Sequence, residues 1–289
     1  SKMKTSISHL PENKQQEIRR IADIILEVVR PEKIILFGSY AKGEYVENRY
    51  QSREGMKSEY ISDYDFLVVT EKDLEKPYLQ ESTIMDRVDR YEPPVNLEIC
   101  SIDYINHGLG WGQYFFSDIV NEGITLFDTG NFEFAAPRVL TREEEKAKAQ
   151  DYFNVWFPQS KEFVIDAKNA LQRLSLNNSA FYLHQSIESL YYTILLVHTG
   201  YKPKTHNIWK LRKKAKAYSE EMFLVFQAET NPEDKRLFEL LKRGYIEARY
   251  KQKEYEIAAW EVEELIARVL QSQRIVEDSC TNKINSIAN

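Results

Sequence analysis

The sequence predicts an α+β protein, with a small mixed β-sheet domain that has helices on one side, followed by an all-α antiparallel helical bundle. Three observations predict this class. Short apolar runs bounded by Gly, Pro and acidic residues precede residue 130, helical spacing without a convincing strand follows residue 141, and 289 residues suit about two domains. We expect a first domain at 1–130, a linker at 131–140 and a helical domain at 141–289.

The first domain opens with an amphipathic helix that begins near Pro11, a residue suited to the first helical turn, and ends before Pro31. Its apolar residues fall at helical spacing on one face. These residues are Ile18, Ile21, Ile25 and Val28. The other predicted elements are strands at 33–37, 65–70, 95–100 and 124–127, and helices at 82–90 and 113–121.

The second domain begins at a capping box, Thr141-x-x-Glu144, and should be entirely helical. We expect Pro158 to break or kink its first helix. The next helix, 178–199, carries one apolar seam and ends at Gly200. The seam consists of Ala180, Leu183, Ile187, Leu190 and Ile194, and later helices are predicted at 206–217, 219–229, 232–250 and 254–275.

Composition narrows the class of protein. With 43% hydrophobic and 12% aromatic residues the chain can bury two cores, and no apolar run reaches the ~18 residues of a membrane span. The polar N-terminus predicts no signal peptide, and Cys100 and Cys280 suggest neither a disulfide framework nor a zinc site. We therefore expect a cytoplasmic protein without a membrane partner. A net charge of −6 and a pI near 5.6 weigh against a dedicated nucleic-acid binder.

Two motifs in the first domain point to phosphate and metal chemistry. Asp63 and Asp65 stand one residue apart at the entry of a strand, so their side chains lie on one face, roughly 7 Å apart along the chain. Two carboxylates at that spacing favour a shared hard cation such as Mg²⁺. Gly38 and Ser39 leave an earlier strand in a turn that offers backbone N–H groups and a hydroxyl to a phosphate.

Gly38-Ser39 with Asp63-x-Asp65 resembles the signature of the DNA polymerase beta-type nucleotidyltransferases, in the branch that includes the minimal and aminoglycoside nucleotidyltransferases. That family has a third acid on a neighbouring strand. Asn96 and Glu98 share one face of the candidate strand, and Glu98 is the predicted acid. If Asn96 occupies the third position instead, the site has a weaker metal ligand and catalysis is in doubt.

The resemblance implies a reaction. Asp63, Asp65 and Glu98 would hold Mg²⁺ or Mn²⁺, and Gly38, Ser39 and Lys42 would contact a nucleoside triphosphate, with ATP expected. An acceptor hydroxyl on a small molecule, a protein or an RNA end would take the nucleoside monophosphate, and pyrophosphate would leave. The polar insert at 44–61, longer than in small members, is expected to be a surface loop beside the site.

The helical half resembles the HEPN domain, a nucleotide-binding module often found beside or fused to minimal nucleotidyltransferases. The matching segments are 181–188, Gly200-Tyr201-x-Pro203 leading to 206–208, and 245–250. The resemblance implies a homodimer.

Arg249 and Tyr250 could stack on a base or hold a phosphate, or could simply pack one helix against another. Ribonuclease members of the group carry an Arg a few residues before a His. Here Lys202 precedes His206, which could instead cap its helix, so RNA cleavage ranks below nucleotidyl transfer. The remaining alternative is a catalytically weak nucleotide-binding or antitoxin-like regulatory protein.

Overall fold

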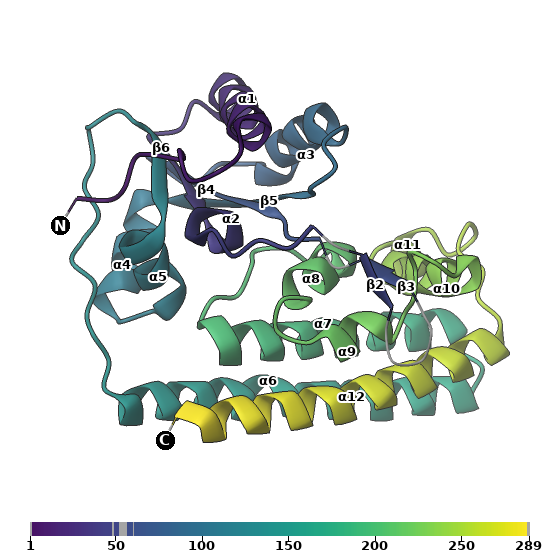
Figure 1. The fold of residues 1–289 in the computed structure, drawn as a ribbon. Coiled ribbons are helices and arrows are strands. Elements are labelled where there is room, and N and C mark those ends of the chain that lie inside the picture. Colours follow the sequence, from purple (N-terminus) through teal and green to yellow (C-terminus); the bar gives the residue numbers. More distant parts are fainter. Residues whose placement is uncertain (1, 48, 52–56, 60, 288–289) are drawn as a thin grey trace. The chain divides into compact units, whose positions relative to one another are not determined.

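The computed structural model describes residues 2–47, 49–51, 57–59 and 61–287, which form two compact units, Ser1–Val139 and Leu140–Asn289. Figure 1 shows a small sheet flanked by helices in the first unit and long helices in the second. The predicted α+β class is therefore confirmed. The elements of the first unit are α1 (Glu12–Val29), β1 (Lys33–Phe37), α2 (Gly38–Lys42), β2 (Arg49–Gln51), β3 (Lys57–Glu59), β4 (Tyr64–Thr70), α3 (Pro77–Val88), β5 (Val95–Ser101), α4 (Ile102–Gly110), α5 (Tyr114–Glu122) and β6 (Ile124–Asp128).

Four strands form the main sheet in the order β5-β4-β1-β6. Strand β1 pairs antiparallel with β4 and with β6, whereas β4 and β5 run parallel, joined by a crossover through α3. The register places Asp65 opposite Phe37 of β1 on one side and opposite Asn96 of β5 on the other. The end of β1 and the start of β4 and β5 therefore meet at one edge of the sheet.

The core of the first unit lies between the sheet and helices α1 and α3. Alternating strand residues such as Leu36, Phe66 and Leu97 meet Ile21 of α1 and Ile84 of α3 in one apolar cluster. Helices α4 and α5 lie on the other side of the sheet in Figure 1, so helices flank both faces and not one face as predicted. A glycine, Gly123, ends α5, because a Cβ there would overlap the Ile35 side chain and the carbonyl of Ile119.

Helix α4 and the strands within the insert also differ from the prediction. Helix α4 was not expected, although Ser101 caps it by accepting from the Tyr104 N–H, and Ile105 and Leu109 are buried at helical spacing. The insert at 44–61 contains the antiparallel pair β2–β3, while residues 48, 52–56 and 60 lie outside the described residues. Two hydrogen bonds between Val46 and Ser62, of 2.8 and 2.9 Å, join the two ends of the insert.

All regular structure described in the second unit is helical. Its elements are α6 (Arg142–Gln172), α7 (Leu176–Thr199), α8 (Ile208–Ala215), α9 (Glu220–Leu224), α10 (Pro232–Arg243), α11 (Glu247–Tyr250) and α12 (Ala259–Ile287). Thr141 caps α6 through the Glu144 N–H, as the capping box predicts. Helix α7 is buried along most of its length and packs against α6, α8 and α12.

Helix α6 continues through Pro158 over 31 residues, so the expected break is wrong. Proline removes the N–H that would donate to the carbonyl of Asn154, and packing of α6 on α7 and α12 supports the helix despite that loss. The helix predicted at 232–250 divides instead into α10 and α11. The division falls at Gly244, where a Cβ would lie 2.9 Å from the carbonyl oxygen of Ala180 in α7.

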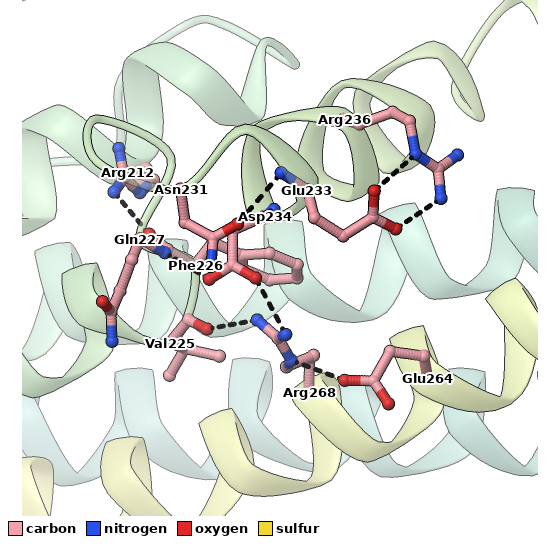
Figure 2. A network of polar contacts seen from close by, with 10 residues as sticks. All are labelled: Arg212, Val225, Phe226, Gln227, Asn231, Glu233, Asp234, Arg236, Glu264 and Arg268. Carbon is pink, nitrogen blue, oxygen red and sulfur yellow. Dashed lines mark hydrogen bonds and ion pairs between the residues drawn. The ribbon is translucent and has the colours of Figure 1, made fainter.

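A polar network joins the segment between α9 and α10 to α12 (Figure 2). The guanidinium of Arg268 donates to Asp234 at 2.9 Å, to the carbonyl of Val225 at 2.7 Å and to Glu264 at 2.9 Å. The other carboxylate oxygen of Asp234 accepts from the Gln227 N–H at 2.8 Å. One carboxylate thus orients both a loop and an arginine of the neighbouring helix.

None of the helices in the described part of the chain combines the length and the apolar character that crossing a bilayer requires.

Candidate functional site

The first candidate site lies at the sheet edge where β1 ends and β4 and β5 begin. Gly38 has φ +74°, and a Cβ built on it would overlap Oδ2 of Asp65. Only glycine lets the backbone after β1 approach this carboxylate so closely. The structure therefore brings together two of the predicted site residues, from motifs that lie 27 positions apart in the sequence. Ser39 follows in α2 and is partly exposed.

Asn96 contacts the same carboxylate from the other side. Its Nδ2 donates to Oδ1 of Asp65 at 2.9 Å, and the two residues are register partners in the parallel pair. Glu98 is the register partner of Leu67, one pleat repeat further along β5, and is only 7% exposed. The position beside Asp65 is thus occupied by an amide, and the assignment of Glu98 as the third acid stays a prediction.

Asp63 precedes β4 and is partly exposed, like Asp65, while Tyr64 between them is buried in the opposite face. The two carboxylates therefore have the alternation that the sequence predicts. Within the described ranges, no group of three His, Cys, Asp or Glu side chains is placed to hold one metal ion. The side chains at this edge that carry oxygen atoms, and so could serve a hard cation, are those of Asp63, Asp65 and Asn96.

Lys42, predicted to contact phosphate, forms an ion pair of 2.8 Å with Glu122 of α5. The hydrogen bond that Lys42 donates to Glu122 is the main cause that raises the pKa of Lys42, with burial acting in the opposite direction. The ammonium group is therefore charged at neutral pH and held by a carboxylate of the same unit.

The second candidate site surrounds His206 in the helical unit. His206 Nδ1 lies 3.0 Å from Oε2 of Glu188, a side chain of α7 that is nearly buried. Burial raises the pKa of Glu188, and the His206 hydrogen bond and the Lys202 charge act against that rise. A carboxylate at Nδ1 selects the tautomer with a proton there, which leaves Nε2 as the acceptor on a side chain that is 56% exposed.

Tyr245 links this pair to a wider aromatic cluster. Its ring stacks at 4.9 Å on His206 and at 4.9 Å on the buried His184, whose Nε2 contacts the carbonyl of His206 at 3.2 Å. Burial is the main cause that lowers the pKa of His184 to about 4, so this ring is neutral at pH 7. Asn207, and not His206, caps α8 by accepting from the N–H groups of Trp209 and Lys210. The possibility that His206 is the cap is therefore wrong.

Arg249 and Tyr250 lie in α11 next to this cluster. The Arg249 guanidinium is 4.3 Å from the ring centre of Phe181, 5.1 Å from that of Tyr245 and 5.0 Å from that of Tyr250, which is 74% exposed. Lys202 lies over the ring of Tyr192, with Nζ 4.6 Å from the ring centre. The sequence did not predict a role for Glu188 in this site, because nothing in the local pattern links it to His206, a loop residue 18 positions later.

Comparison with protein families agrees with one of the two resemblances. Residues 153–278 match the HEPN domain, a region that includes Glu188, Lys202, His206 and Arg249 and spans less than half of the chain. The search of curated proteins found no match to the chain. The second candidate site therefore lies in a HEPN-like helical region, and the first lies in the small α/β unit outside the matched residues.

Proposed function

We propose that the first unit is a metal-dependent nucleotidyltransferase. The observation that carries the proposal is the contact between Gly38 and the carboxylate of Asp65, which joins a glycine-serine turn to the Asp-x-Asp pair at one sheet edge. Because Gly38 has no Cβ, the backbone of the turn lies close to the Asp65 carboxylate, which suits the binding of a phosphate together with the cation that accompanies it. The residues present fit such a cation.

In this proposal Asp63 and Asp65 hold Mg²⁺, which supplies charge stabilisation to the phosphates when bound. Gly38 and Ser39 contact the outer phosphates. The acceptor hydroxyl oxygen attacks the α-phosphorus, the bond to the bridging oxygen of pyrophosphate breaks, and the hydroxyl proton passes to a carboxylate, with Glu98 as the candidate. The acceptor is a hydroxyl on a small molecule, a protein or an RNA end.

Release of pyrophosphate tests this proposal. The full chain is incubated with each labelled nucleoside triphosphate and Mg²⁺, and we expect release that falls at least about 100-fold in Asp63→Ala. Asp23→Ala, an exposed acid on α1, is the matched control and should leave the rate unchanged. Triphosphate binding without turnover would instead support the regulatory alternative, which the amide of Asn96 beside Asp65 favours. In that case Asn96→Asp should raise turnover.

RNA cleavage at His206 is a second candidate, favoured by the His206–Glu188 pair in the HEPN-like region. Nε2 of His206 would take the proton of a ribose 2′-hydroxyl, whose oxygen attacks the adjacent phosphorus. The bond to the 5′-oxygen breaks, and that oxygen takes a proton from water, leaving a 2′,3′-cyclic phosphate. A single-stranded RNA should then be cleaved by the full chain and by His107→Ala, an exposed histidine of the first unit, but not by His206→Ala.

A further inference from the structure

The loop before His206 carries a lysine and no arginine, yet the folded chain places a guanidinium close to the same histidine. Arg249 and His206 both contact the ring of Tyr245, at 5.1 and 4.9 Å. The guanidinium carbon and the imidazole ring therefore lie within about 10 Å of each other, which is the sum of the two distances. The charge of Lys202 also acts on Glu188, the carboxylate that contacts His206.

The arginine is oriented but not neutralised. Its Nε donates to the carbonyl of Tyr245 at 2.8 Å, which fixes the plane of the guanidinium group. No carboxylate of the described chain lies within ion-pair distance of Arg249, and Glu247 in the same helix pairs with Arg243. Its other neighbours are the faces of aromatic rings. A planar cation in this setting has its terminal N–H groups available for a bidentate contact with phosphate.

The ring of Tyr250 extends the same surface. It is 74% exposed and lies 5.0 Å from the Arg249 guanidinium, so a base can stack on it while an adjacent phosphate meets the arginine. A duplex would not present unstacked bases to such a ring, whereas a single strand would.

We propose that Arg249 binds a phosphate of a single-stranded RNA whose reacting phosphodiester lies at His206. This inference rests on the RNA-cleavage candidate for its substrate, but the phosphate contact itself can be measured without cleavage.

The experiment measures binding of a labelled single-stranded DNA oligonucleotide to the full chain by fluorescence anisotropy at several salt concentrations. This probe lacks the 2′-hydroxyl and cannot react by the proposed chemistry. We expect Arg249→Gln to weaken binding about tenfold and to reduce the slope of log K against log salt by about 0.7, because one phosphate contact is lost. Arg249→Lys should keep the salt dependence of binding but bind less tightly than the native chain, because lysine retains the charge without the planar set of N–H donors.

Arg243→Gln is the matched control, because Arg243 lies six positions earlier and is paired with Glu247. It should leave both affinity and slope unchanged. Equal affinity and slope in Arg249→Gln and the native chain would overturn the inference, and so would absence of oligonucleotide binding by the native chain. Cleavage that survives His206→Ala, or that never occurs, would remove the ribonuclease proposal while the Arg249 contact is still decided by the salt slope.

Discussion

At the scale of single residues, both the backbone conformation of position 38 and its close approach to Asp65 require glycine. Its φ of +74° favours glycine, and the Asp65 carboxylate occupies the space that a side chain would need. Gly130 has a similar φ of +79° with nothing within 4 Å of a built Cβ. Comparing a substitution at Gly38 with one at Gly130 therefore distinguishes the cost of backbone strain from the cost of the steric contact with Asp65.

We predict that Gly38→Ala lowers the free energy of unfolding by about 1–3 kcal/mol and abolishes pyrophosphate release, because the Cβ displaces Asp65. Gly130→Ala should show only the cost of strain, about 1 kcal/mol, with normal release. Chemical denaturation and the release assay check the pair. Equal effects of the two substitutions would contradict a special role for the contact at Gly38.

His184 makes stability depend on pH in a definite direction. Its pKa is lowered to about 4, chiefly by burial, from an ordinary value of 6.5, so between these values the unfolded chain binds a proton that the folded chain does not. Stability is present above about pH 6.5 and is lost as the pH falls towards 4, by up to about 3 kcal/mol. As the pH falls through this window, the denaturation midpoint of the native chain should approach that of His184→Gln. Parallel pH profiles would refute the assignment.

At the scale of elements, buried arginines connect helices that are short by themselves. Arg212 of α8 is fully buried, donates to both oxygens of Glu229 at 2.6 and 2.7 Å and to the carbonyl of Phe226 at 2.6 Å, and lies over the ring of Phe223. Helix α9 has only five residues, too few to be stable without such contacts.

Arg212→Met should therefore cost roughly 3–5 kcal/mol, because it leaves buried carbonyl groups and a carboxylate without their donor. Arg243→Met removes an exposed i,i+4 pair with Glu247 and should cost less than about 1 kcal/mol. Guanidinium-chloride unfolding of both variants tests the contrast. A loss below 1 kcal/mol in Arg212→Met would show that the network contributes little.

At the scale of the whole molecule, each unit has its own apolar core. One cluster of buried residues draws only on residues between Ile7 and Ile124, and the other only on residues between Ala149 and Ile287. A core that needs no residue from the other unit can form without it.

We expect a fragment of residues 140–289 to fold by itself, with helical far-UV circular dichroism and one cooperative thermal transition. The His206 cluster lies within this fragment, so its RNA activity, if present in the full chain, should be retained. A fragment that aggregates or melts without cooperativity would show that the helical unit depends on the first.

A homodimer stays a prediction, and the described surface offers a physical reason for it. Val155 and Ile165 of α6 are 57% and 53% exposed, and burying such side chains at a two-fold interface would be favourable. Light scattering at micromolar concentration should give twice the mass of the chain. A monomer at that concentration would contradict the prediction.

The sequence by itself determined the class of fold and most of its elements. Short apolar runs identified β1, β4, β5 and β6, and helical spacing with the Thr141 cap and Gly200 identified α6 and the end of α7. These features depend on residues near one another in the chain, so a local pattern contains them. The break expected at Pro158 and the unpredicted α4 mark where packing outweighs propensity.

Only the tertiary structure decided which side chains meet. Asn96 and Glu98 share one strand face, and the register of β5 against β4 placed Asn96 at Asp65. Glu188 reached His206, and Arg249 reached Tyr245 beside it, because helices and a loop far apart in the sequence pack around one aromatic cluster. Register and helix packing are set by the sum of many long-range contacts, which no short stretch of sequence specifies.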